Sequence, residues 1–153
     1  MNAVQSRRWA PHVTVATVVS RAGQLLLVEE EIGGRRLLNQ PAGHLEPGET
    51  LAQAAMRETL EETGWEVQLT SLIGSYQWTA SDGTPFLRFA FAGEPLRHHP
   101  AQPLDKGIVQ ALWLDPVALQ AQSARLRSPL VWQVVKDWLG GQRYPLSLLK
   151  QLP

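Results

Sequence analysis

The sequence contains no cysteine. A chain without thiols cannot form disulfides or zinc–thiolate sites, and it cannot use a cysteine nucleophile. Long hydrophobic runs are also missing. No segment approaches the roughly 18 apolar residues that a membrane-spanning helix needs, and residues 1–12 hold no apolar run of signal-peptide length. We therefore expect a cytoplasmic protein with no membrane partner.

An excess of charge of either sign is missing as well. Lys and Arg together number 14, Asp and Glu together number 14, and the formal net charge is zero. General nucleic-acid binders and proteins that bind anionic membranes are normally basic. The balance argues against both classes, and we expect no nucleic-acid partner.

The chain has the length and hydrophobic content of one folded domain. Its 153 residues are 44% hydrophobic and 18% charged, which is ordinary for a globular domain. Alternating β-branched runs predict strands, and apolar residues at helical spacing predict helices. The predicted strands cover residues 12–20, 24–30, 36–40, 66–78, 85–92 and 109–114, and the predicted helices cover 51–63, 116–122 and 129–139. Strands interleaved with a few helices favour an α+β fold built as an α/β/α sandwich, after an irregular terminus at 1–10.

The first predicted helix carries a cluster of acids. Glu58, Glu61 and Glu62 follow the spacing i, i+3 and i+4, so a helix places them on one face. Three like charges at that distance repel one another. Oxygen ligands suit hard cations such as Mg²⁺ or Mn²⁺, so the cluster predicts a divalent-metal site.

Both ends of this helix are signalled. Thr50 is the expected N-cap, and Gln53, three residues later, completes a capping box. Gly64 is the expected C-cap.

The stretch from Gly43 to Trp65 reads GHLEPGETLAQAAMRETLEETGW. It resembles the Nudix box, which is written G-x5-E-x7-R-E-U-x-E-E-x-G-U with U an aliphatic residue. The matching positions are Gly43, Glu49, Arg57, Glu58, Glu61, Glu62 and Gly64. Thr59 and Trp65 depart from the pattern, but only at its aliphatic packing positions.

This resemblance implies a Nudix fold with a mixed central sheet. We expect a single Nudix hydrolase domain over residues 1–153, with a core at about 11–146. The family hydrolyses a diphosphate linked to another group. The implied cofactor is Mg²⁺, with Mn²⁺ as a substitute, because cations cancel the charge between acids and diphosphate and polarise a phosphoryl oxygen.

The resemblance also assigns residue roles. The metal ligands are Glu58, Glu61, Glu62 and the backbone carbonyl of Ala42. Arg57 pairs with Glu49 and orients the metal ligands, so both count among the catalytic residues.

Two roles stay open from the sequence. Arg57 has a second partner at helical spacing in Glu61, which is an ordinary solvated pair, and Glu49 suits any helix N-terminus. The general base is Glu61 within the box, Asp105 in the loop before the last predicted strand, or another loop acid, with Glu94 a poorer candidate.

Substrate recognition lies outside the box. Tyr76 and Trp78 offer rings for stacking. Arg88 stands between Leu87 and Phe89 in an apolar strand, where a charge needs a partner or a pocket. His44, which follows the box glycine, is placed to contact phosphate.

Strings outside the box resemble a bacterial phosphatase subgroup of the family. They are PHVTVATVV, LLNQPAGHLEPGETL, YQWTASDGTPFLRF, LRSPLV and GQRYPL, and they span positions 11–146. That subgroup releases inorganic phosphate from nucleoside tri- and diphosphates and acts on hydroxymethylpyrimidine pyrophosphate. The alternatives are a Nudix pyrophosphatase of ADP-ribose or dinucleotides, and a Nudix domain that senses nucleotides without hydrolysis. We expect a nucleotide or pyrimidine diphosphate as substrate, and a monomer or homodimer.

Overall fold

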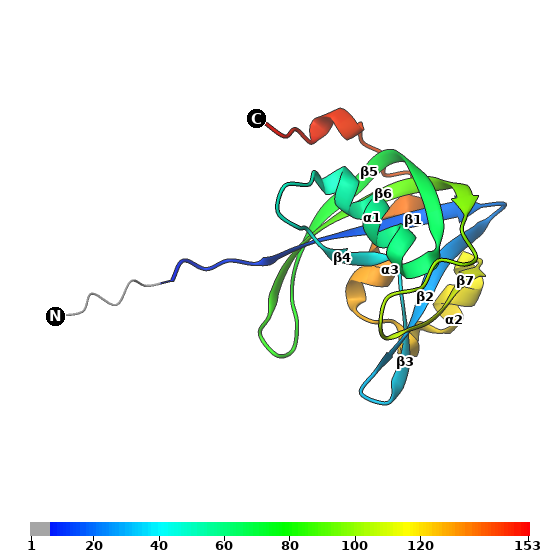
Figure 1. The fold of residues 1–153 in the computed structure, drawn as a ribbon. Coiled ribbons are helices and arrows are strands. Elements are labelled where there is room, and N and C mark those ends of the chain that lie inside the picture. Colours follow the sequence, from blue (N-terminus) through cyan, green and yellow to red (C-terminus); the bar gives the residue numbers. More distant parts are fainter. Residues whose placement is uncertain (1–6) are drawn as a thin grey trace.

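The computed structural model describes residues 7–153, and within them seven strands form one mixed sheet with helices on both of its faces (Figure 1). In chain order the elements are β1 (His12–Arg21), β2 (Gln24–Ile32), β3 (Arg35–Asn39), β4 (Ala42–His44), α1 (Leu51–Thr63), β5 (Trp65–Thr79), β6 (Pro85–His98), β7 (Ile108–Leu114), α2 (Pro116–Ala121), the 3-10 helix η1 (Ser123–Arg125), α3 (Pro129–Leu139) and the 3-10 helix η2 (Leu146–Leu148). The predicted α+β class and mixed sheet are confirmed.

All predicted strands and helices are present, and the differences lie in what local pattern cannot signal. The three-residue strand β4 is too short for any periodicity to indicate it. Strand β6 runs to His98, past the predicted end at 92, because its pairing with β5 continues as far as Trp65 opposite His98. The irregular terminus predicted at 1–10 falls partly outside the described residues, and residues 7–11 are irregular.

Strand β1 lies at the centre of the sheet. It runs parallel to β6 from His12 to Val19, and it meets β2 at the hairpin end, where Ser20 lies opposite Leu25. Towards its other end β1 pairs instead with β4, with Ala16 opposite Ala42. Strand β4 therefore takes the edge of β1 that β2 leaves, and it carries the box glycine into the middle of the molecule.

The two faces of the sheet have separate hydrophobic cores. On one face, Ile73 packs in a cluster with Val134 and Val135 of α3. On the other face, Phe91 packs in a cluster with Ala54 and Ala55 of α1. Helix α1 is thus held against the sheet by its small apolar side, which leaves its acidic side for other contacts.

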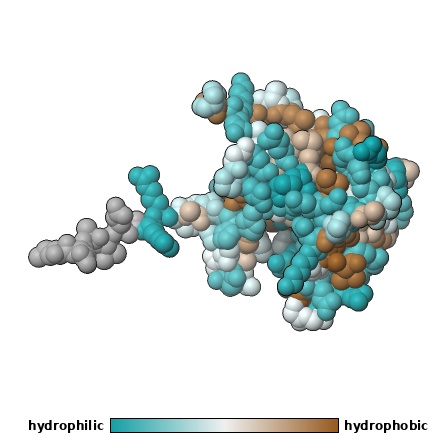
Figure 2. Space-filling model, viewed as in Figure 1, coloured by the Kyte–Doolittle hydropathy of each residue, from teal (hydrophilic) through white to brown (hydrophobic). Residues whose placement is uncertain are grey.

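Among residues 7–153, none of the helices combines the length and the apolar character that crossing a membrane would require. The face shown in Figure 2 is mostly hydrophilic, with hydrophobic residues in smaller separate patches.

The ends of α1 are fixed as the sequence predicts. The Gln53 N–H donates to the Thr50 hydroxyl at 3.0 Å, and the Thr50 N–H donates to the Gln53 side chain at 2.8 Å. Gly64 ends the helix in the left-handed conformation, with φ of 74°. By contrast Ser128, which stands at the N-cap of α3, makes no side-chain capping bond.

We expect Thr50→Ala to destabilise the protein by about 1 kcal/mol, because it removes a capping hydrogen bond from a helix N-terminus. Ser128→Ala is the matched control and should change stability by less than about 0.5 kcal/mol. Urea unfolding of both variants measures the difference. Equal losses would contradict a capping role for Thr50.

Candidate active site

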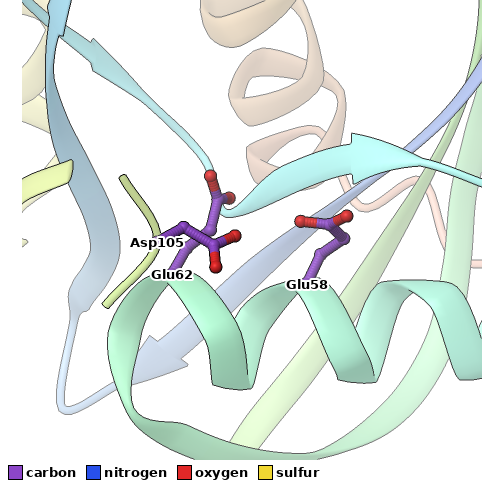
Figure 3. A group of neighbouring side chains, drawn as sticks. All are labelled: Glu58, Glu62 and Asp105. Atoms are coloured by element: carbon purple, nitrogen blue, oxygen red, sulfur yellow. The ribbon is translucent and has the colours of Figure 1, made fainter. Parts of the chain in front are cut away.

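Three acids meet beside α1. Glu58 and Glu62 project from the helix and Asp105 comes from the loop at 99–107 (Figure 3). One oxygen from each side chain lies within 4.8 Å of the other two. The Asp105 N–H donates to the carbonyl of Glu61 at 3.0 Å, which fixes this loop to the helix. Two distant parts of the sequence therefore build one cluster of oxygen ligands.

Within the cluster Glu62 is buried, Glu58 is half-buried and Asp105 is exposed, and the acids together lack enough positive charge. Burial raises the pKa of Glu62 to about 9; the Ala42 N–H, 2.7 Å from Oε1, lowers it, while Glu30, Glu58 and Asp105 raise it further. Burial also raises the pKa of Glu58. Acids arranged this way are poorly stable as anions on their own. A divalent cation would supply the missing charge, and oxygen donors suit Mg²⁺ and Mn²⁺, so these residues fit the metal that the sequence implies.

Gly43 makes room for this arrangement. A Cβ atom at Gly43 would lie 2.1 Å from the carboxyl carbon of Glu58. Any larger residue would push Glu58 away from Glu62 and Asp105. The box glycine is therefore required by close approach of β4 to α1.

Arg57 ties the box together. It donates to both oxygens of Glu49, from Nε at 2.9 Å and from Nη2 at 2.7 Å. Nη1 donates to Glu58 at 2.8 Å and to Glu61 at 3.2 Å, and Nη2 also reaches the carbonyl of His44 at 3.0 Å. The bidentate bond to Arg57 holds the pKa of Glu49 below its usual range. The predicted pairing with Glu49 is present, and so is the pair with Glu61 at helical spacing.

Glu61 takes a different position from the other two box acids. Its side chain is 38% exposed and turns toward Arg57. Among residues 7–153, the group of acids close enough to share one ion consists of Glu58, Glu62 and Asp105. Roles for Glu61 and for the Ala42 carbonyl as metal ligands stay predictions. Sequence reasoning singled out Asp105 as a base, but only the fold places it beside Glu62.

A cavity of about 340 Å³ opens next to β4. Ala42 and Gly43, which contact the acids, form part of its wall. The other lining residues are Thr14, Glu30, Asn39, His44, Trp78, Ala80, Asp82, Thr84, Phe86, Arg88, Arg127, Ser128 and Leu130. A somewhat larger cavity, of about 420 Å³, lies under the C-terminal tail beside Leu51 and is mainly apolar. The smaller one is the better substrate site because it adjoins the acids.

Three of the four residues predicted to bind substrate meet in this cavity. They are His44, Trp78 and Arg88. The ring of Trp78 stacks on Phe86 with centroids 5.6 Å apart. Nε2 of His44 lies 3.0 Å from Nδ1 of His12. Burial, followed by the charge of His12, lowers the pKa of His44.

Tyr76 is placed elsewhere. Its hydroxyl donates to Asp137 of α3 at 2.7 Å, and its ring lines a separate depression beside Leu72. Burial and this bond raise the pKa of Tyr76 above its usual range. The structure therefore separates Tyr76 from the other three residues and gives it a packing contact with α3.

Other residues that line the cavity could not be predicted from the sequence. Glu30 is the middle one of three successive acids, Glu29–Glu31, that follow the apolar run at 25–28, and Thr14 and Asn39 lie within strands. The sequence therefore holds no signal that singles out Glu30. Their convergence depends on β1 and β2 separating, which local sequence does not encode.

Comparison with known proteins shows the family to which the chain belongs. A family model described as the NUDIX domain matches residues 10–133. The chain is 50% identical over 139 residues to the phosphatase NudJ of Escherichia coli (strain K12), which covers 91% of this chain and 90% of that protein. The same values hold for phosphatase NudJ of Shigella flexneri.

Solved structures agree. A NUDIX hydrolase from Nitrosomonas europaea superposes with a TM-score of 0.91 at 47% identity, and it covers 94% of this chain and 98% of that one. An Ap4A hydrolase from C. elegans superposes with a TM-score of 0.65 at 18% identity, and the match covers 85% of this chain and 96% of that one. The two proteins share the fold. With a family match over most of its length, this chain belongs to the Nudix family and is a hydrolase of phosphoanhydride bonds similar to the phosphatase NudJ.

Proposed function

We propose that this protein is a Mg²⁺-dependent phosphatase of nucleoside tri- and diphosphates that also accepts hydroxymethylpyrimidine pyrophosphate and releases inorganic phosphate. The observation that carries the proposal is the cluster of Glu58, buried Glu62 and Asp105 next to a cavity sized for a small ligand. Similarity to phosphatase NudJ supports the choice of a phosphatase.

The acids have a direct use in this reaction. Glu58, Glu62 and Asp105 would hold Mg²⁺, and the carbonyl of Ala42 is a further candidate ligand. When bound, the cation neutralises the diphosphate and polarises a phosphoryl oxygen. Without positive charge between them, the substrate and the acids would repel each other.

Arg57 and Glu49 position the acids of the cluster. Arg57 holds Glu58 at 2.8 Å while its other nitrogens are fixed by Glu49. This restrains the carboxylate in the orientation that a cation needs. The contact of Arg57 with the His44 carbonyl also ties β4 to α1, so the cavity and the acids keep a constant spacing.

Glu61 is our choice as general base. It lies beside the cluster, is more exposed than Glu58, and is oriented by Arg57. Its carboxylate would accept the proton of the attacking water. Asp105 is the alternative base, and its closeness to Glu62 favours a ligand role instead.

The non-phosphate half of the substrate would occupy the cavity. Trp78 offers a ring face, and Arg88 offers N–H donors. His44 follows Gly43, which approaches Glu58, so it lies on the side of the cavity nearest the acids. Tyr76 has no place in this arrangement because it bonds to Asp137.

A substrate panel with Mg²⁺, resolved by mass, tests the function. Nucleoside triphosphates should yield the diphosphate and orthophosphate, nucleoside diphosphates the monophosphate, and hydroxymethylpyrimidine pyrophosphate the monophosphate. A chelator should abolish all of these reactions because the acids then lack their cation. Activity confined to ADP-ribose or dinucleotides, or pyrophosphate as the product, would refute the proposal.

We expect Glu58→Gln and Glu62→Gln to lower Mg²⁺-dependent turnover by roughly 100-fold or more, because each removes a charged ligand. The fold should persist, since glutamine keeps the shape and can still accept the Ala42 N–H. Glu94→Gln, at an exposed position of β6, is the control. Full turnover in either test variant, with circular dichroism unchanged, would show that the metal assignment is wrong.

Mg²⁺ titrations of Glu61→Gln and Asp105→Asn distinguish a base from a ligand. For Glu61→Gln we expect kcat to fall by about 100-fold with little change in the Mg²⁺ needed for half-maximal activity. For Asp105→Asn we expect that Mg²⁺ concentration to rise by about 10-fold or more. The reverse pattern would make Asp105 the base and Glu61 the ligand.

A further inference from the structure

Unpaired polar atoms surround the cavity beside the acids. Arg88 is 8% exposed, and its Nε and Nη1 are shielded from solvent. Within residues 7–153, neither nitrogen has a hydrogen-bond partner, nor do Oε2 of Glu30, Oδ1 of Asn39 and Oγ1 of Thr14. All four residues line the cavity. Buried polar groups are normally hydrogen-bonded, so their convergence indicates a polar ligand.

Arg88 is costly to bury in this way. It lies in the middle of the sheet, with β1 on one side at Thr14 and β5 on the other at Tyr76. Burial lowers the pKa of Arg88 to about 10, although the nearby carboxylates of Glu30 and Glu62 raise it, so the side chain stays cationic at neutral pH. A buried cation that lacks direct partners destabilises the fold. Its N–H groups therefore have their use in binding rather than in folding.

The acceptor opposite Arg88 is Glu30. Its Oε2 lies 3.6 Å from Nε of Arg127, too far for a hydrogen bond, and burial raises the pKa of Glu30. Oδ1 of Asn39 is a second unpaired acceptor in the same wall. Among its unpaired atoms, the cavity thus presents N–H donors from Arg88, acceptors from Glu30 and Asn39, and the Thr14 hydroxyl, which can do both.

The remaining wall suits a flat ring. Trp78 and Phe86 stack with an angle of 23° between their planes and line the cavity. Aromatic walls of this kind hold planar ligands by stacking. A volume of about 340 Å³ is near the lower end for ligand pockets and favours one heterocyclic group.

We propose that Arg88 and Glu30 determine substrate specificity by binding the polar edge of an amino-substituted aromatic heterocycle. A ring nitrogen or carbonyl would accept from Arg88, and the amino group would donate to Glu30, with Asn39 taking its second proton. This inference rests on the proposed function, because the diphosphate must lie at the acids for the ring to enter the cavity.

Cytosine and uracil are the sharpest pair for this edge. Cytosine places an amino donor next to its ring acceptor, whereas uracil places a carbonyl where the amino group was. The uracil carbonyl would face the acceptors of Glu30 and Asn39, so these groups would be desolvated without a bond. Phosphate binding by Arg88, the other use of its charge, would not distinguish the two bases.

The experiment compares kcat/KM for CTP and UTP with Mg²⁺. The parent should favour CTP by about 10-fold or more, since a site that hydrogen-bonds a group discriminates against its absence. Glu30→Gln should reduce the ratio to about 2-fold or less, because an amide both donates and accepts. Arg88→Met should lower kcat/KM for CTP by about 10-fold or more and kcat/KM for UTP by much less. Because CTP and UTP would use the same metal cluster, a substitution that disturbs the cluster lowers kcat/KM for both and leaves their ratio unchanged.

Matched controls come from the same strands. Glu31→Gln on β2 and Arg97→Met on β6 alter exposed side chains and should leave the CTP preference as in the parent. Circular dichroism checks folding. If Arg88→Met does not fold, the CTP-to-UTP ratios of kcat/KM for the parent and for Glu30→Gln still test the inference.

Two results would overturn the inference while the proposed function stands. One is a parent ratio below about 2 with normal Mg²⁺-dependent hydrolysis. The other is an equal loss for CTP and UTP in Arg88→Met, which would assign Arg88 to phosphate. If the parent hydrolyses neither nucleotide, the proposed function fails, and calorimetric titration of CMP and UMP into metal-free protein decides. Tighter CMP binding by about 5-fold would support the ring contact, and equal or absent binding would refute it.

Discussion

The burial of Glu62 beside Glu58 and Asp105 is the constraint on which the rest of the structure depends. These acids are brought together by a helix and a loop that bonds to it. Burial pushes the pKa of Glu62 to about 9, so the metal-free fold carries an electrostatic cost at its centre. The capping box, the small apolar face of α1 and the bidentate bond of Arg57 to Glu49 offset that cost. A cation bound between these acids would supply the positive charge that they lack.

The short strand β4 (Ala42–His44) connects this centre to the cavity. Its first residue donates to Glu62, its second leaves space for Glu58, and its third gives a carbonyl to Arg57 and a ring to the cavity. This is feasible because β1 and β2 separate beyond their hairpin and leave an edge for β4 to pair. The proposed metal site and the proposed ring pocket would therefore share three consecutive residues, which would keep phosphate and heterocycle at a fixed spacing.

The sequence predicts those parts of the site whose residues lie close together along the chain. The helix and both of its caps follow from residues within one stretch, and the pairing of Arg57 with Glu49 follows from the resemblance to the Nudix box; the structure confirms them. Asp105 and Glu30 were beyond such reasoning as cluster and cavity residues, because only the fold brings a loop and a strand end to the helix. Tyr76 and Trp78 share one strand face, yet α3 covers the first, while the second reaches the cavity. Alternation predicts the side of the sheet on which a residue lies and not which neighbour covers it.

The position of the cation is the most direct test. Crystals of the protein grown with Mn²⁺ in place of Mg²⁺ would locate it by anomalous scattering, without reliance on turnover. The expected result is a peak within ligand distance of carboxylate oxygens of Glu58 and Glu62, with Asp105 completing the group, and its loss in crystals of Glu62→Gln. A peak elsewhere, or none at these acids at saturating Mn²⁺, would contradict the assignment of this cluster as the metal centre.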